Sequence, residues 1–331
     1  MSDKTPLRVH IATPPTGEAR RGLETALVPR ITLTLGPEPV PPDTEVFVGG
    51  RPTREELESC PRLRFLVIPY AGLPIVTRDL VLAHFPHLTV CNLHHNAPAA
   101  AELAVALLLA AAKRIIPADA ALRRGDWRIR YEGGPALILD GKTALVLGLG
   151  AVGTRVAQAL HGLGMSVHAI RRNLGGAHPP HVVAHPLTAL PALLPQADAL
   201  VIALPLTPET EGLIGEPELN LLRPSAVLVN VARGPIVDEE ALYRVLSERR
   251  IAAAGLDVWY RYPSTAEERE HTLPSRFPFH ELENVALSPH RGGALGNEEL
   301  EVRRMRDLTA TLNAIARGEP VPHRVDVPAG Y

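Results

Sequence analysis

Four polar features follow apolar stretches that we predict to be strands, and their residue types suit one kind of chemistry. Arg233 follows AVLVNVA, Asp257 follows IAAAGL, and His290 closely follows NVALS. The fourth feature is the turn with Ala71 and Gly72, after LRFLVIP. An imidazole can protonate a carbonyl oxygen, and a guanidinium can hold a carboxylate through two hydrogen bonds. Together these groups suit the reduction of a 2-oxo acid. Singly, each is equally explained as a surface ion pair, a helix cap or a hydrogen-bonded loop residue.

A glycine pattern predicts the source of the hydride that such a reduction needs. Gly148, Gly150 and Gly153 form G-x-G-x-x-G between the predicted strand TALVLG and a helix, and another strand, MSVHAI, follows. The first two glycines allow a tight turn and close approach to a pyrophosphate, and the third lets helix and strand pack closely. This context predicts a site for a nicotinamide dinucleotide rather than a glycine-rich turn without a ligand.

Arg171 and Arg172 stand at the end of MSVHAI, where dinucleotide-binding folds usually carry an acidic residue. A guanidinium cannot accept hydrogen bonds from a ribose diol, but it can pair with a 2′-phosphate. We therefore predict NADP as the cofactor, with NAD as the alternative. Two solvated surface arginines remain the other interpretation.

The elements that must position these residues alternate between strands and helices, which indicates an α/β fold with parallel sheets. A first series of strands is predicted at 7–12, 45–50, 63–69 and 88–93, followed by a helix over 99–116 and a surface arm over 120–140. A second series begins at 143 and ends before a last helix at 297–317. We predict a dinucleotide-binding domain over 99–296, and a substrate-binding domain over 1–98 plus 297–331.

Composition excludes several classes of protein. A chain of 331 residues is long enough for two domains, and its net charge of −2 does not favour nucleic-acid binding. Only Cys60 and Cys91 are cysteines, so neither a disulfide framework nor a thiolate metal site is expected. The apolar run at 103–112 is far shorter than the ~20 residues that a membrane span needs, and the start MSDKTPLRVH does not resemble a signal peptide. We expect a cytoplasmic protein that binds no metal and no membrane.

Four sequence blocks carry a resemblance to a known family. They are ALPLTPETEGLIG (203–215), VLVNVARGPIVDEEAL (227–242), AAGLDVW (253–259) and NVALSPHRGG (284–293). With the glycine loop they make the chain resemble the D-isomer-specific 2-hydroxyacid dehydrogenase family over almost its whole length. The resemblance implies two Rossmann-like or flavodoxin-like domains, an active site in the cleft between them, and a homodimer with the 120–140 arm reaching across. It also implies an NAD(P)-dependent reductase of 2-oxo acids such as glyoxylate or hydroxypyruvate, giving a D-2-hydroxy acid.

The same resemblance implies a role for each site residue. His290 would be the acid/base, Arg233 would bind the substrate carboxylate and polarise its carbonyl, and Asp257 would contact the nicotinamide carboxamide. The backbone N–H groups of the Ala71–Gly72 turn would bind the same carboxylate, beside Tyr70. The full set implied for the cofactor is Gly148, Gly150, Ala151, Val152, Gly153, Arg171, Arg172, Leu204, Pro205, Thr210, Val231, Ala232, Asp257 and Gly292.

The sequence departs from the family at Tyr262, where a glutamate normally pairs with the catalytic histidine. A phenol has a pKa of about 10, so at neutral pH it can orient an imidazole but cannot stabilise imidazolium by charge. A longer segment follows, and its glutamates are candidates to replace the missing acid: Glu267, Glu268, Glu270 and Glu281. Three interpretations stay open: a reductase with an acid-shifted pH optimum, a dehydrogenase with a changed substrate, or a cofactor-binding regulator without turnover. Trp127, in the arm, is expected in a dimer contact.

Overall fold

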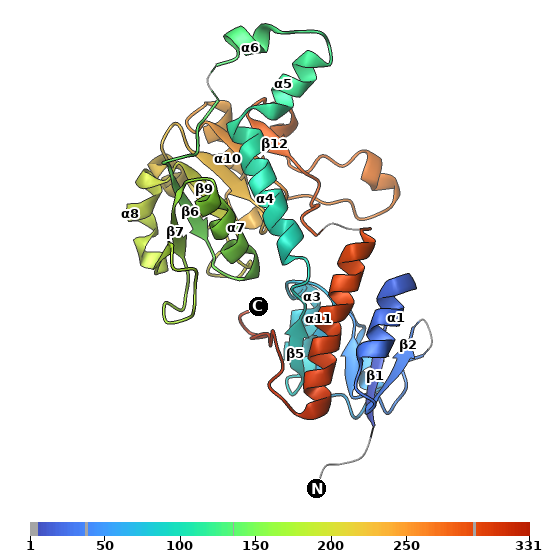
Figure 1. Ribbon diagram of the computed structural model, residues 1–331. Helices are drawn as coiled ribbons and strands as arrows, with labels where there is room; N and C mark the ends of the chain where they lie inside the picture. Colours follow the sequence, from blue (N-terminus) through green and yellow to red (C-terminus); the bar gives the residue numbers. More distant parts are fainter. Residues whose placement is uncertain (1–5, 37–38, 135, 294–295) are drawn as a thin grey trace. The chain divides into compact units, whose positions relative to one another are not determined.

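The computed structural model describes residues 6–36, 39–134, 136–293 and 296–331. The chain divides into two compact units (Figure 1). Unit 1 combines the chain up to Asn96 with the segment from 294 onward, and unit 2 comprises Ala97–Gly293. Our expected domain boundaries, at 98/99 and 296/297, lie two and three residues further along the chain than these divisions.

Unit 1 is built on a five-stranded sheet in the order β2-β1-β3-β4-β5, and every neighbouring pair is parallel. Its strands are β1 (Leu7–Ile11), β2 (Ile31–Leu35), β3 (Val46–Val48), β4 (Phe65–Ile68) and β5 (Thr89–Asn92). Our sequence analysis missed β2, an edge strand with the sequence ITLTL whose residues are all only half-buried. Its hydrophobic signal is weak because threonine alternates with the apolar residues.

Helices cover both faces of this sheet. They are α1 (Gly17–Ala26), α2 (Arg54–Glu58), α3 (Ile75–His84) and α11 (Glu298–Arg317). On one face α1 and α11 pack together over Val9 and Val48, with Leu308 and Leu312 of α11 fully buried (Figure 1). On the other face α2 and α3 bury Leu57 and Val81 in a second apolar cluster. The predicted last helix, 297–317, is confirmed, with Asn297 as the capping residue of α11.

Unit 2 contains a seven-stranded parallel sheet in the order β12-β11-β10-β9-β6-β7-β8. Its strands are β6 (Thr143–Leu147), β7 (Ser166–Ile170), β8 (Val182–His185), β9 (Ala199–Ile202), β10 (Val227–Asn230), β11 (Ala253–Leu256) and β12 (Val285–Leu287). The central strands read as unbroken apolar runs because both of their faces are covered. The order reverses beside β6, and parallel sheets bind ligands at such a point.

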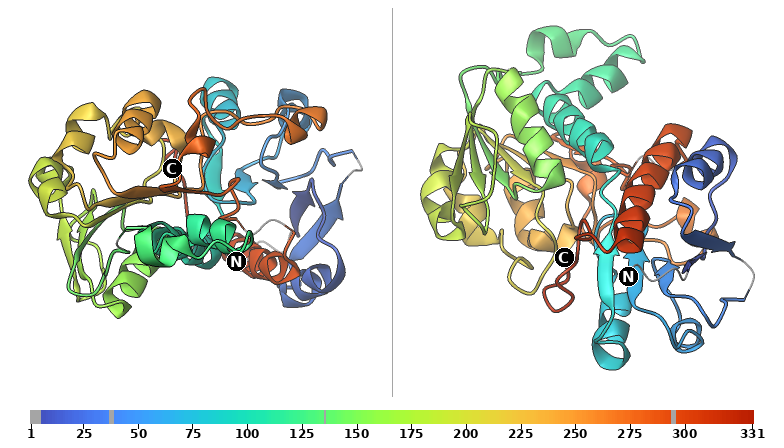
Figure 2. Two further views of the ribbon diagram at one scale, coloured as in Figure 1. Left: turned by 90° about the horizontal axis from the view of Figure 1, so that it is seen from above. Right: turned by 60° about the horizontal axis from the view of Figure 1, so that its bottom comes forward.

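The helices of unit 2 are α4 (Ala97–Ala112), α5 (Ile115–Leu122), α6 (Arg128–Glu132), α7 (Ala151–Gly162), α8 (Leu190–Leu193), α9 (Glu216–Leu221) and α10 (Glu239–Ser247). Short 3₁₀ helices are η1 (Leu187–Ala189), η2 (Leu194–Gln196), η3 (Gly234–Ile236), η4 (Glu267–Glu270) and η5 (Phe279–Glu281). On one face of the sheet α4 and α7 pack in one apolar cluster, and α8, α9 and α10 pack on the other (Figure 2).

The long apolar helix is shorter than we predicted. We expected it over 99–116, but α4 ends at Ala112, and Arg114 adopts a left-handed backbone with φ 55° before α5 begins. A left-handed residue ends a helix because it turns the chain out of the helical path. Helix α4 lies directly on β11, where a β-carbon at Gly255 would come 2.8 Å from Cβ of Leu107. Within the described residues, no helix is both long and apolar enough to cross a membrane.

The predicted surface arm, 120–140, contains the end of α5 and all of α6, and its residue 135 lies outside the described residues. Four large apolar side chains of the arm are exposed: Leu122, Trp127, Tyr131 and Ile138. Such a concentration of exposed apolar side chains is typical of an interaction surface.

Candidate functional site

The predicted site residues of unit 2 all follow the carboxyl ends of its strands. Because the seven strands are parallel, these ends share one edge of the sheet. Three loops, after β6, β7 and β9, carry most of the residues assigned to the dinucleotide, and we call them the glycine end. The others follow β10, β11 and β12: Val231, Ala232, Asp257 and Gly292. Three more loops, after β10, β11 and β12, carry Arg233, Asp257 and His290, and we call them the histidine end.

The glycine loop after β6 has the geometry that a pyrophosphate requires. Gly148 has φ +96°, and a β-carbon there would come 2.7 Å from the carbonyl oxygen of Ala203. At Gly153 a β-carbon would come 1.8 Å from the carbonyl oxygen of Gly148, whereas at Gly150 it would meet nothing within 4 Å. Helix α7 begins at Ala151 with no side chain capping it. Open space at Gly150 beside an uncapped helix N-terminus therefore fits the phosphates of a dinucleotide.

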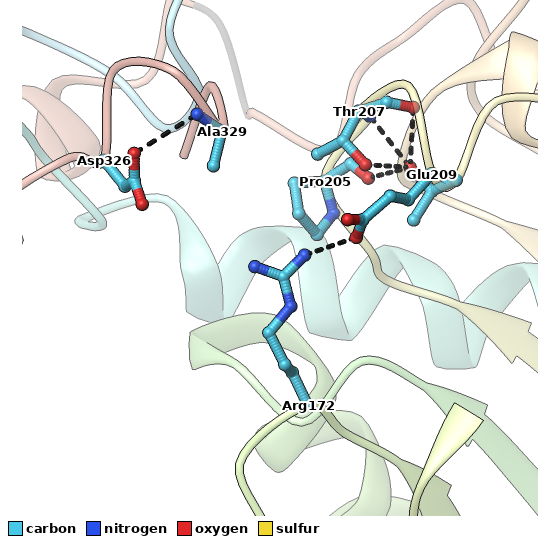
Figure 3. Close-up of polar contacts among 7 residues, drawn as sticks. Arg172, Pro205, Thr207, Glu209, Asp326 and Ala329 are labelled. Atoms are coloured by element: carbon cyan, nitrogen blue, oxygen red, sulfur yellow. Dashed lines mark hydrogen bonds and ion pairs between the residues drawn. The ribbon is translucent and has the colours of Figure 1, made fainter. Parts of the chain in front are cut away.

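Thr210 shapes the loop after β9. Its hydroxyl donates to the carbonyl of Pro205 at 2.7 Å and accepts from the backbone N–H of Thr207 at 2.8 Å. Figure 3 shows this compact turn, with Glu209 projecting from it. The contacts that the structure gives Thr210 are thus internal to the turn, and its predicted contact with the cofactor stays a prediction. The Asp326–Ala329 hydrogen bond drawn in the same figure, at 3.2 Å, lies within unit 1.

The two arginines after β7 are held differently. One amino group of the Arg171 guanidinium donates to the carbonyls of Gly176 and Ala177, at 2.9 and 3.1 Å. Arg172 forms an ion pair with Glu209 at 2.7 Å (Figure 3). The loop carbonyls fix the position of Arg171, while Arg172 is tied to the loop that follows β9.

Asp257 organises the histidine end. It is 1% exposed, and its carboxylate accepts hydrogen bonds from the Ser288 hydroxyl and from the backbone N–H groups of Arg291 (2.7 Å) and Gly292 (2.9 Å). These bonds join the end of β11 to the loop that carries His290. A carboxylate with three donors is the arrangement expected for a buried charge. We also predicted that Asp257 contacts the nicotinamide carboxamide, and that contact stays a prediction.

Tyr262 lies against His290. Its hydroxyl is 2.9 Å from Nδ1 of His290 and accepts the backbone N–H of Trp259 at 3.1 Å. The Trp259 N–H occupies one lone pair of the oxygen, so the phenol proton can be donated to Nδ1. With the phenol as the donor, the proton of a neutral imidazole would lie on Nε2. His290 itself has φ 56°, a left-handed conformation that non-glycine residues adopt mainly at special positions.

The electrostatics around this pair favour a neutral imidazole. Burial and the positive charge of Arg233 lower the pKa of His290 below 6.5, and the negative charge of Asp257 only partly opposes them. Partial burial raises the pKa of Tyr262 above 10. The phenol is thus uncharged at neutral pH and supplies no negative charge to the ring.

None of the four candidate glutamates is the partner that the structure gives to His290. Glu268 accepts the backbone N–H of Ser264, and Glu281 lies 3.8 Å from His280. Glu267 and Glu270 are exposed in η4. Within the described residues the hydrogen-bond partner of Nδ1 is therefore Tyr262, at the very position of the expected acid.

Arg233 is presented by a turn that our sequence analysis missed. The side chain of Asn230, the last residue of β10, accepts from the Ala232 N–H and donates to the Arg233 carbonyl, both at 3.0 Å. Gly234 packs so closely that a β-carbon would come 2.4 Å from the carbonyl oxygen of Trp259. A polar residue that closes an otherwise apolar strand, as in VLVN, was the available signal.

The substrate-binding residues predicted in unit 1 form a turn after β4. Gly72 has φ +85°, a backbone conformation that glycine adopts more readily than other residues. The ring of Tyr70 packs on Gly50. Burial raises the pKa of Tyr70, and the nearby Arg51 guanidinium partly opposes this rise. Arg51 was also missed, because one exposed arginine after a strand carries no sequence signal.

Comparisons with known proteins agree with this arrangement. Residues 105–292 match the model of the D-isomer specific 2-hydroxyacid dehydrogenase, NAD binding domain. The chain is 39% identical to a glyoxylate reductase of Thermococcus gammatolerans, covering 82% of this chain and 79% of that protein. It is 34% identical to the glyoxylate reductase of Thermococcus litoralis, covering 85% and 82%. D-3-phosphoglycerate dehydrogenases also match, and the chain spans 52% of the one from Methanocaldococcus jannaschii.

A solved structure extends the likeness over both units. The D-isomer specific 2-hydroxyacid dehydrogenase of Xanthobacter autotrophicus Py2, in complex with NADPH and MES, has a TM-score of 0.78 and 26% identity, covering 99% of this chain and 100% of that one. Our prediction of two Rossmann-like or flavodoxin-like domains is confirmed. The chain therefore belongs to the D-isomer specific 2-hydroxyacid dehydrogenase family and is an NAD(P)-dependent oxidoreductase that acts on CH–OH groups.

Proposed function

We propose that this protein reduces a small 2-oxo acid of the glyoxylate or hydroxypyruvate type to the D-2-hydroxy acid, with His290 as the proton donor. The observation that carries the proposal is the group formed by Arg233, Tyr262 and His290 at one edge of the sheet. The similarity to two glyoxylate reductases supports the substrate class.

Each residue has a defined role in this reaction. The Arg233 guanidinium binds the substrate carboxylate and polarises its carbonyl, and His290 gives a proton from Nε2 to the carbonyl oxygen. The turn with Tyr70, Ala71 and Gly72 offers backbone N–H groups to the carboxylate. A dinucleotide bound at the glycine end would supply the hydride. Asp257 holds the His290 loop in place.

The Tyr262 hydroxyl differs from a carboxylate in that it can both donate and accept a hydrogen bond. A carboxylate at this position can only accept a hydrogen bond from Nδ1, so it leaves Nε2 of a neutral imidazole free to take a proton, as oxidation requires. The phenol can donate to Nδ1 of the neutral ring, and it can accept from the Nδ1–H of imidazolium. Only the protonated ring, imidazolium, is acidic enough to protonate the carbonyl oxygen, and the lowered pKa of His290 shifts this form toward acid pH.

We propose NADP as the preferred cofactor, held by the loops of the glycine end. Arg171 stands at the end of β7 with its guanidinium fixed by two carbonyls, a position suited to a 2′-phosphate. The similar dehydrogenase of Xanthobacter autotrophicus Py2 was solved with NADPH, which supports this preference.

We also propose a homodimer formed through the arm. Trp127, which is 59% exposed, would be buried in that contact. Trp127→Ala should lower the mass observed by light scattering at low protein concentration. An unchanged mass would refute the role of Trp127.

The proposed function is tested by initial rates of NADPH oxidation with glyoxylate, hydroxypyruvate, pyruvate and bulkier 2-oxo acids from pH 5 to 8, with NADH in parallel. We expect turnover that increases toward acid pH, because the pKa of His290 is lowered. His290→Asn should abolish turnover, while the matched control His280→Asn, in η5, should not. Tight NADPH binding without turnover on any substrate would instead indicate a cofactor-binding regulator, and turnover only with bulkier acids would indicate a changed substrate.

A further inference from the structure

The Arg172–Glu209 ion pair joins two loops that flank the glycine loop. Arg172 follows β7 and Glu209 follows β9, and both strands are neighbours of β6 in the sheet. Since neighbouring strands lie about 4.8 Å apart, the two loops start roughly 10 Å from each other. The two long side chains span this separation and meet at 2.7 Å (Figure 3).

Both partners of the pair are held by their own loops. Glu209 lies inside the turn that Thr210 closes through Pro205 and Thr207. Arg172 directly follows Arg171, whose guanidinium is fixed by the carbonyls of Gly176 and Ala177. The loops that carry the two residues are therefore held by the fold, and the ion pair itself is formed by exposed side chains, at 62% and 73%.

We propose that Glu209 sets the cofactor specificity of this site by engaging Arg172 and so weakening the binding of a 2′-phosphate. This inference rests on the proposed function, and it adds a residue that acts against the two arginines. The 2′-phosphate carries close to two negative charges at neutral pH. One carboxylate beside the arginines neutralises part of their charge and repels the phosphate. NADH lacks this phosphate, so Glu209 affects its binding much less.

The test compares dissociation constants of NADPH and NADH for the full-length protein, followed by quenching of protein fluorescence at low ionic strength. The variants are Glu209→Gln and a control, Glu216→Gln. Glu216 forms an ion pair of similar length with Arg244, at 2.6 Å, but it belongs to α9 and not to the glycine end. We expect Glu209→Gln to tighten NADPH binding roughly three- to tenfold and to change NADH binding less than twofold. The control should change neither.

Two results would overturn the proposal. One is an unchanged ratio of the two dissociation constants in Glu209→Gln. The other is an equal change for both cofactors, since this would mean that the substitution disturbs the loop and not the charge. Glu209→Ala, which also removes the carboxylate, should repeat the gain for NADPH, and NADH affinity reports whether each variant is folded. These measurements need no substrate, so a failure of turnover leaves their outcome interpretable.

Discussion

The glycine end and the histidine end lie on one edge of the same sheet but depend on different kinds of interaction. At the glycine end the loop conformation depends on close approach of backbone atoms. At Gly153, for example, a β-carbon would come 1.8 Å from the carbonyl oxygen of Gly148. The histidine end has such a close approach at Gly234, but there the site residues are held by side-chain hydrogen bonds, made by Asp257 and Tyr262. A glycine that is packed this closely against backbone cannot be replaced by a larger residue, whereas a different side chain can make the same hydrogen bond. This difference explains how a tyrosine can occupy the glutamate position and keep the contact while losing the charge.

The largest expected effect is at the glycine end. Gly153→Val should abolish measurable binding of either dinucleotide, because the added side chain collides with backbone that cannot move away. Titration of fluorescence with NADPH and NADH measures the loss. Gly162→Ala, at the end of the same helix and with nothing within 4 Å of the new β-carbon, should bind both normally. Normal dinucleotide binding by Gly153→Val would show that binding does not depend on the close backbone packing at this glycine.

A smaller but still large effect is expected at Asp257. Asp257→Asn replaces one acceptor oxygen with an N–H₂ group, so at least one of its three donors loses its partner. Leaving such a buried group unsatisfied costs about 1–3 kcal/mol, which should appear as a lower free energy of unfolding in urea. Glu281→Gln, an exposed control, should leave it unchanged. Equal stability of Asp257→Asn and wild type would show that the carboxylate does not hold the His290 loop.

Tyr262→Glu should change the pH profile and not the fold. A carboxylate beside the imidazole favours its protonated form, so the pKa of His290 should rise by roughly one to two units. The protonated donor would then persist to higher pH, and the decline of the reduction rate with rising pH should move by the same amount. Tyr262→Phe, which keeps the ring and removes the hydroxyl, serves as the matched variant and should show no such alkaline displacement. If Tyr262→Glu has the wild-type profile, His290 is not the titrating donor.

The smallest expected effect concerns Arg171. Arg171→Gln should weaken NADPH binding by roughly fivefold, the effect of about 1 kcal/mol from one charge near a solvated phosphate, and leave NADH binding nearly unchanged. Titration with both cofactors measures the difference. Arg155→Gln, an exposed arginine on α7 that donates to the Ala151 carbonyl, is a useful control. Equal weakening of both cofactors would mean that Arg171 only supports the 173–178 loop.

The sequence by itself determined the parallel αβ architecture, the glycine loop and the strand ends that carry Arg233, Asp257 and His290. These features follow from short-range patterns: apolar runs of strand length, glycines at set spacing, and polar residues directly after a strand. The edge strands β2 and β8 and the end of α4 escaped prediction. Threonines weaken the pattern of β2, β8 has four residues of which one is buried, and the left-handed Arg114 interrupts the helix.

Only the tertiary structure decided how the side chains are partnered. Nothing local to Tyr262 shows that its hydroxyl meets His290, 28 positions away, in preference to a glutamate of the longer segment. Likewise, the Arg172–Glu209 pair joins residues 37 positions apart because β7 and β9 flank β6 in the sheet. Strand order and loop conformation set these contacts, and neither can be read from the residues of one segment.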